Sequence, residues 1–152
     1  MIDLGVRVEF YEQVIEGEPS KGYLGHVDRT EGYRAVAVPA VGERIMAASL
    51  RVTEREPEGE PWVPLPGPDQ LVVRFVEHHL VPERDGKVPA WWDSYDEPGA
   101  TVVVHISLGT SRGGELMQRM VRQFVADGWG CTGPEGSELW EYGLQAREEL
   151  RR

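Results

Sequence analysis

The chain has 152 residues, a formal net charge of −10 and a single cysteine. This length suits one domain, so residues 1–152 are expected to fold as a single unit. One cysteine excludes an intramolecular disulfide and favours a reducing, cytoplasmic compartment. The acidic charge disfavours direct binding of nucleic acid, and no apolar stretch approaches the ~20 residues of a membrane helix.

The N-terminal segment is predicted to form a strand followed by a loop. Residues 5–15 alternate in part, with Val6, Val8 and Phe10 on one face, which is typical of a half-buried strand. Residues 16–32 are rich in glycine and polar residues and predict a loop that holds a short strand at 23–27.

Two further strands are predicted before the middle of the chain. Residues 33–38 alternate between apolar and other side chains, and the sequence at 39–43 is typical of a turn. Residues 44–52 are a third candidate strand, although Met46, Ala47 and Ala48 would also suit a helix.

The middle of the chain alternates between loops and its two strongest strands. Proline is so frequent at 53–69 that an extended surface crossing is expected there. Strands are predicted at 70–81 and 101–108, separated by a long loop. The near-continuous apolar run of the second strand predicts a central strand that is covered on both faces.

One amphipathic helix is predicted after this strand. Its apolar stripe consists of Leu116, Met117, Met120, Val121, Phe124 and Val125. Ser111 is the expected N-cap, and Gly128 suits the left-handed position that ends a helix.

The C-terminal segment has two interpretations. Residues 129–132 and 139–144 could form a short closing hairpin, and the alternative is a helix capped by Ser137 that runs toward Arg147. Gly143 argues mildly against the helix. The order of the elements predicts an α+β fold: a mostly antiparallel bent sheet or small open barrel, one C-terminal-half helix and the closing hairpin.

Three histidines on predicted strands are candidates for chemistry. His78 and His79 are consecutive, so their side chains point to opposite faces of a strand. If the strands pair, one of them could share a face with His105, and Glu77 or Asp28 could add a carboxylate. Such a group could hold a metal ion or perform acid–base catalysis. The spacing matches no motif, so ordinary hydrogen bonding is the alternative.

Two other features could bind ligands or react. The turn from the strand to the helix carries Thr110, Ser111, Arg112 and Gly113, whose hydroxyls, backbone N–H groups and guanidinium could hold an anion. The alternative is a plain capped connection, since no phosphate-binding motif is present. Cys131 follows a helix C-terminus, which disfavours a thiolate, so we expect an inert packing residue.

The long loop before the second strong strand is the candidate for partner binding. Its aromatic and acidic residues are Trp91, Trp92, Asp93, Tyr95 and Asp96. Aromatic side chains flanked by carboxylates are good anchors for basic protein partners. The alternative is that both tryptophans fold back over the sheet.

Two functional hypotheses follow. The first is a non-enzymatic, protein-binding module of bacterial or viral origin, of the immunity, inhibitor or accessory type. It acts through its acidic aromatic loops, without a cofactor. Its partner is another protein, and the acidic charge suits a basic one. The second is a small enzyme or an anion- or ligand-binding domain that uses the turn at 109–114 or a cluster of His78 and His105. The absence of a catalytic motif favours the first hypothesis and leaves the second open.

Overall fold

The computed structural model describes residues 1–12, 23–51, 70–81, 98–108, 113–133 and 138–151. The elements within these ranges are, in chain order, β1 (Ile2–Glu12), β2 (Tyr23–Ala35), β3 (Arg44–Met46), the short 3-10 helix η1 (Ala47–Leu50), β4 (Gln70–His79), β5 (Gly99–Leu108), α1 (Gly113–Ala126), β6 (Gly130–Thr132) and α2 (Glu138–Leu150). The extended crossing predicted at 53–69 lies outside the described residues.

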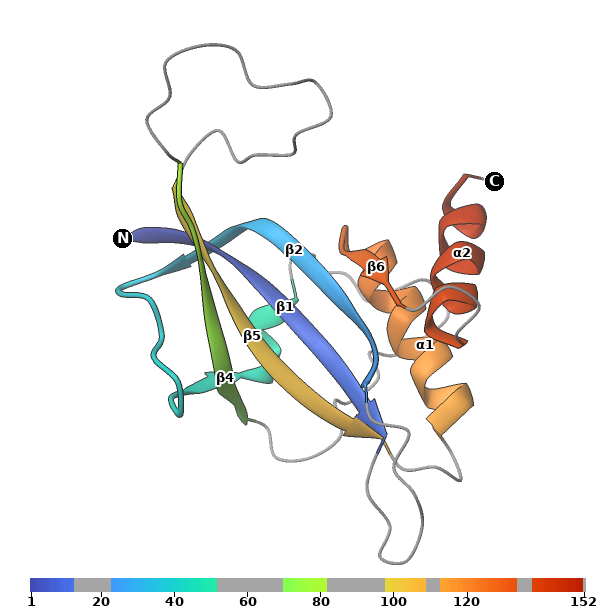
Figure 1. Cartoon of the computed structure of the whole chain (residues 1–152). Coiled ribbons are helices and arrows are strands. Elements are labelled where there is room, and N and C mark those ends of the chain that lie inside the picture. Colours follow the sequence, from blue (N-terminus) through green and yellow to red (C-terminus); the bar gives the residue numbers. More distant parts are fainter. Residues whose placement is uncertain (13–22, 52–69, 82–97, 109–112, 134–137, 152) are drawn as a thin grey trace, which may run out of the picture.

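The described strands form one open, bent sheet in the order β3-β4-β5-β1-β2-β6 (Figure 1). β1 and β5 run parallel, and every other neighbouring pair is antiparallel. The predicted α+β class with a mostly antiparallel, bent sheet is therefore confirmed. The parallel pair at its centre, β1 with β5, joins strands that lie far apart in the sequence. The order of the strands along the chain does not predict that these two strands pair.

The central strands carry the core. Val6, Val8 and Phe10 of β1 are buried at alternate positions, as the alternation predicts. β5 lies between β4 and β1, and its consecutive residues Val103 and Val104 are both fully buried. Both faces of β5 are therefore covered, which confirms the prediction from its apolar run.

β2 is one long strand where the sequence predicted two short strands separated by a loop. The short strand predicted at 23–27 is confirmed, but the predicted loop is wrong over residues 28–32, because residues 23–35 form a continuous strand. The strand predicted at 33–38 is its last part and ends at Ala35. β2 pairs with β1 along its length, so its backbone hydrogen bonds are made in the ladder. Polar residues such as Asp28 and Thr30 are tolerated because pairing and exposure, rather than propensity alone, decide strand formation.

The segment predicted as a third strand divides into two elements. Only Arg44–Met46 forms a strand, which pairs with the start of β4. The next residues form η1, so the helical alternative is realised as a single 3-10 turn. That turn places Leu50 in the core, where it is 3 % exposed.

The predicted amphipathic helix is confirmed as α1. Its Met120, Val121 and Val125 are buried, and Phe124 packs against the same core. The ring of Phe124 meets the ring of Phe10 edge to face, with centroids 6.5 Å apart. The predicted cap Ser111 lies outside the described residues.

α1 ends in a Schellman motif. Gly128 has a φ of +93°, which favours glycine. The N–H of Gly128 donates to Val125 O at 3.1 Å, and the N–H of Trp129 donates to Phe124 O at 3.0 Å. The rings of Phe124 and Trp129 then pack with centroids 4.9 Å apart. The predicted left-handed role of Gly128 is therefore confirmed.

The predicted closing hairpin is wrong. Gly130–Thr132 does form a strand, but it pairs with β2, and residues 139–144 lie in the helix α2, so the helical alternative for this segment is realised. The cap predicted for that helix, Ser137, lies outside the described residues. Alternate residues suggested a strand, yet Tyr142 and Ala146, spaced by one helical turn, are the ones that face the core. Gly143 lets the helix approach β6, since a Cβ there would lie 2.9 Å from Sγ of Cys131.

Both helices lie on one side of the sheet (Figure 1). Residues from α1 and α2 share a single hydrophobic core with residues from β1, β2, β4, β5 and η1. The opposite face of the sheet is therefore not part of this core. None of the described helices combines the length and the apolar character needed to cross a membrane.

Candidate functional site

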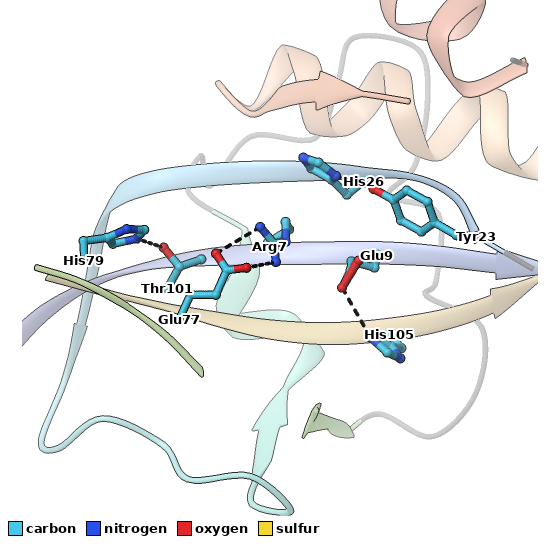
Figure 2. A network of polar contacts seen from close by, with 8 residues as sticks. All are labelled: Arg7, Glu9, Tyr23, His26, Glu77, His79, Thr101 and His105. Atoms are coloured by element: carbon cyan, nitrogen blue, oxygen red, sulfur yellow. Dashed lines mark hydrogen bonds and ion pairs between the residues drawn. The ribbon is translucent and has the colours of Figure 1, made fainter. Parts of the chain in front are cut away.

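The face of the sheet opposite the core is polar and aromatic. Because side chains alternate along a strand, the buried residues of β1 leave Arg7, Glu9 and Tyr11 on this side. The strand registers bring polar and aromatic residues of the neighbouring strands beside them. Together this polar face comprises Arg7, Glu9, Tyr11, Tyr23, His26, Asp28, Phe75, Glu77, His79, Thr101, Val103 and His105, most of which are drawn in Figure 2.

Five rings of the polar face form a row that crosses β4, β5, β1 and β2. The successive centroid distances are 5.6 Å for Phe75–His105, 4.5 Å for His105–Tyr11, 5.6 Å for Tyr11–Tyr23 and 6.3 Å for Tyr23–His26. Phe75 is 55 % exposed and Tyr23 is 39 % exposed. This aromatic row therefore offers large ring surfaces to solvent in one place.

Glu9 lies inside the aromatic row. It stands opposite His26 on β2 and opposite His105 on β5. Its Oε1 lies 3.4 Å from Nε2 of His105, and 14 % of its side chain is exposed. Figure 2 shows the carboxylate between His105 on one side and the hydrogen-bonded pair of Tyr23 and His26 on the other. One carboxylate is thus surrounded by rings.

The rings around Glu9 are held in their neutral forms. Burial lowers the pKa of His105 below its ordinary value of 6.5, although the Glu9 carboxylate acts in the opposite direction. Burial also lowers the pKa of His26, against the effect of Asp28. Burial and then the charge of Glu9 raise the pKa of Tyr23 to about 12. At neutral pH both imidazoles are therefore uncharged, and the Tyr23 phenol keeps its proton.

Arg7 is paired with Glu77. Its Nη2 donates to Oε1 of Glu77 at 2.5 Å, and its Nη1 donates to Oε2 at 3.1 Å. The hydrogen bond from Arg7 lowers the pKa of Glu77. Burial acts to lower the pKa of Arg7, but the hydrogen bond and the charge of Glu77 outweigh it, so that pKa is raised. Both groups are charged, and the guanidinium is directed at Glu77.

The three histidines predicted as a metal or acid–base cluster lie apart. His79 shares the polar face with His105, as the pairing predicts, and its Nε2 lies 2.8 Å from Oγ1 of Thr101. His78 stands opposite Ala100 on the other face of the strand. From Ala100 to His105 the chain advances roughly 16 Å along β5. Among the described residues, no group of three potential metal ligands occurs.

Other predicted site residues fall outside the described part of the chain. These are the loop residues Trp91, Trp92, Asp93, Tyr95 and Asp96, and Thr110, Ser111 and Arg112 of the turn. Gly113 is the first residue of α1. Cys131 lies on β6 and is partly buried, and burial raises the pKa of its thiol to about 11.

Sequence reasoning missed most of the aromatic row. The alternation of Arg7, Glu9 and Tyr11 against the apolar residues of β1 was visible, and it placed them on one face. Tyr23 and Phe75 join them only through the register of β2 with β1 and the pairing of β4 with β5. A sequence therefore indicates which residues of one strand share the polar face. It does not indicate which strands pair and bring those residues together.

Comparisons of the chain with known protein families, with curated proteins and with solved structures find no match. The geometry and charge of the polar face are therefore the observations that bear on function.

Proposed function

We propose that this protein is a non-enzymatic module that binds a basic protein partner, and that the aromatic row is part of its binding surface. One observation carries the proposal: five rings are in contact across four strands around one carboxylate, and two of them, Phe75 and Tyr23, are substantially exposed. Aromatic residues are enriched at protein interfaces and supply much of their binding energy.

Charge supports a basic partner. The chain has a formal net charge of −10, which attracts cationic surfaces and speeds their association. Cations are attracted to the faces of aromatic rings, and the Glu9 carboxylate adds a negative charge at the same place. The same field repels the phosphates of nucleic acids, which makes a protein the better partner.

The acidic loop extends this proposal on sequence grounds. Trp91, Trp92 and Tyr95, with Asp93 and Asp96, combine the same two chemistries as the aromatic row. A single cysteine is compatible with a partner that is met in the cytoplasm. An immunity, inhibitor or accessory protein, encoded by a bacterium or a virus, would have these properties.

Affinity capture from an extract of the native host tests the proposal. The bait is compared with a row variant, Tyr23→Ser combined with Phe75→Ser, and with a control, Val36→Ser combined with Val41→Ser, which changes exposed residues away from the row. A partner with a high isoelectric point should be retained by the wild type and the control, and its affinity should fall by about tenfold or more in the row variant.

Equal retention of that partner by the row variant contradicts the proposal for this surface. Loss of the partner only in a Trp91→Ala and Trp92→Ala variant would instead assign recognition to the loop. A partner with an acidic surface would contradict the expected charge.

A small enzyme or ligand-binding domain is the second candidate, and the contact between Glu9 and His105 favours it. A neutral imidazole beside a carboxylate is a common arrangement for general-base catalysis. In that case a screen of small metabolites by thermal shift should give a ligand whose binding depends on His105. Loss of binding in His105→Asn, with partner capture unchanged, would support this candidate over the first.

A further inference from the structure

We infer that Glu9 binds the guanidinium group of an arginine side chain of the partner, flanked by the rings of Tyr11, Tyr23 and His105. The inference rests on the proposed function and names the chemistry that the aromatic row recognises. Its basis is the position of one carboxylate among rings at the centre of the sheet.

The charge of Glu9 has no permanent cation as an ion-pair partner among the described residues. Its Oε1 lies 3.4 Å from Nε2 of His105, and that ring is neutral at neutral pH because burial lowers its pKa. Arg7 lies two residues earlier on the same strand, but both of its terminal nitrogens bind Glu77, at 2.5 and 3.1 Å. A partly buried carboxylate without a cation favours a cationic ligand.

The rings select for a flat cation. Tyr11 is the next residue after Glu9 on the polar face of β1. Its ring contacts the rings of His105 and Tyr23, at centroid distances of 4.5 and 5.6 Å, so aromatic rings lie on both sides of it. A guanidinium group is planar, stacks on aromatic faces and binds carboxylates through two N–H groups. An ammonium group is a compact, strongly hydrated charge that uses such surfaces less well. Figure 2 shows that Glu9 lies between side chains of β2 and β5.

Neighbouring charges set the expected strength. Arg74 and Arg7 both act on His105 and lower its pKa, so they also oppose an incoming cation. Asp28 and Glu77 act in the opposite direction on His26, on the same face. Because Arg7 is neutralised by Glu77, Arg74 is the main opposing charge, and its removal should strengthen the binding of a cation.

The test uses small probes and the full chain. N-acetyl-arginine amide is titrated against the protein, and amide shifts are followed by nuclear magnetic resonance. N-acetyl-citrulline amide is the control, because it has nearly the same shape without the charge. The arginine probe should bind in the ~millimolar range. It should shift the amides of Tyr11, Tyr23 and His105, and the citrulline probe should not.

Variants assign the effect to Glu9. Glu9→Gln should weaken binding of the arginine probe by about fivefold. Glu148→Gln, which removes the same charge from an exposed position of α2, should leave binding unchanged. Arg74→Gln should strengthen binding. Thermal unfolding of each variant shows that the fold is retained.

Three results would overturn the inference: equal binding of the citrulline probe, equal binding by Glu9→Gln, or tighter binding of N-acetyl-lysine amide. These failures are separable from failure of the proposed function. If the row variant loses its partner but the arginine probe does not bind, only the inference about Glu9 falls. If the probe binds at Glu9 but the row variant keeps its partner, the proposed docking surface falls, and the inference that the ligand of Glu9 is an arginine of the partner falls with it.

Discussion

Arg7 and Glu77 form a bidentate ion pair that bridges β5, the strand that lies between theirs. Arg7 stands opposite Val103, and Glu77 stands opposite Thr101, so the pair spans neighbouring polar-face positions of β5. Val103 is fully buried although it does not belong to the hydrophobic core. Its register neighbours, Arg7 and Phe75, are well placed to cover it with their side-chain stems and rings.

Breaking this pair should cost little stability but alter the site. Glu77 is 46 % exposed, so Glu77→Gln should reduce the free energy of unfolding by ~1 kcal/mol or less. A double-mutant cycle with Arg7→Gln in urea should give a coupling energy that decreases in salt. Because the released Arg7 can then turn toward Glu9, Glu77→Gln should also weaken the arginine probe. A coupling energy indistinguishable from zero would contradict the pair.

Two phenylalanines of the same sheet should differ sharply in their effect on stability. Phe10 is fully buried and packs on Phe124, whereas Phe75 is 55 % exposed on the polar face. Phe10→Ala should lower the free energy of unfolding by about 3–5 kcal/mol, since it removes a core side chain and leaves a cavity. Phe75→Ala should cost less than about 1 kcal/mol. Urea unfolding measures both, and comparable losses would show that the two faces are wrongly assigned.

The end of α1 should depend on Gly128 more than the turn before β3 depends on Gly42. Both have positive φ, +93° and +90°, so alanine at either position costs ~1–2 kcal/mol of backbone strain. A Cβ at Gly128 would also lie 2.7 Å from Nη1 of Arg29, which donates to Asp127 O at 3.0 Å, whereas a Cβ at Gly42 meets nothing within 4 Å. Gly128→Ala should therefore be the more destabilising in thermal unfolding. Equal losses would mean that Arg29 moves aside freely.

The sequence predicted best the elements in which apolar side chains recur with the period of a strand or of a helix. The alternation on β1 and the helical stripe around Met120 and Val121 each report a buried face directly. The middle of β2, residues 28–32, was predicted as loop because its polar residues are stabilised by pairing with β1, which no local pattern reveals. For α2 the sequence left a hairpin and a helix open, and the hairpin was preferred because Trp140, Tyr142 and Leu144 alternate. In the helix, Tyr142 and Ala146 carry the packing.

The candidate site was less predictable than the fold. The histidines were candidates for a metal or acid–base cluster because of their residue type alone. In the structure His78 and His105 are separated along the sheet and lie on different faces. The contact that matters for His105 is with Glu9, a residue almost a hundred positions away, and it depends on the parallel pairing of β1 with β5. Long-range register therefore creates this site, and a single sequence does not encode register in a readable motif.

Cys131 should be a slow nucleophile in the native protein. Burial raises the pKa of its thiol to about 11, against the opposing charge of Arg147. A disulfide reagent added at about pH 8 should therefore react ~100-fold faster in urea than under native conditions, because the thiolate and the accessible sulfur both increase on unfolding. Fast native labelling would contradict the packing of α2 against β6.

The stability of the fold should fall as the pH drops below neutrality, through two histidines of the polar face. Burial lowers the pKa of His26 and of His105 below 6.5, so the folded chain binds fewer protons than the unfolded chain in acid. Their contribution is fully present above about pH 6.5 and is lost as the pH falls through the folded-state pKa values. The melting temperature at about pH 5.5 should therefore lie below that at about pH 7. A variant with both His26→Gln and His105→Gln should show a smaller decrease, and His78→Gln, at an exposed position, the wild-type decrease. A decrease that survives unchanged in the double variant would assign the pH dependence to other groups.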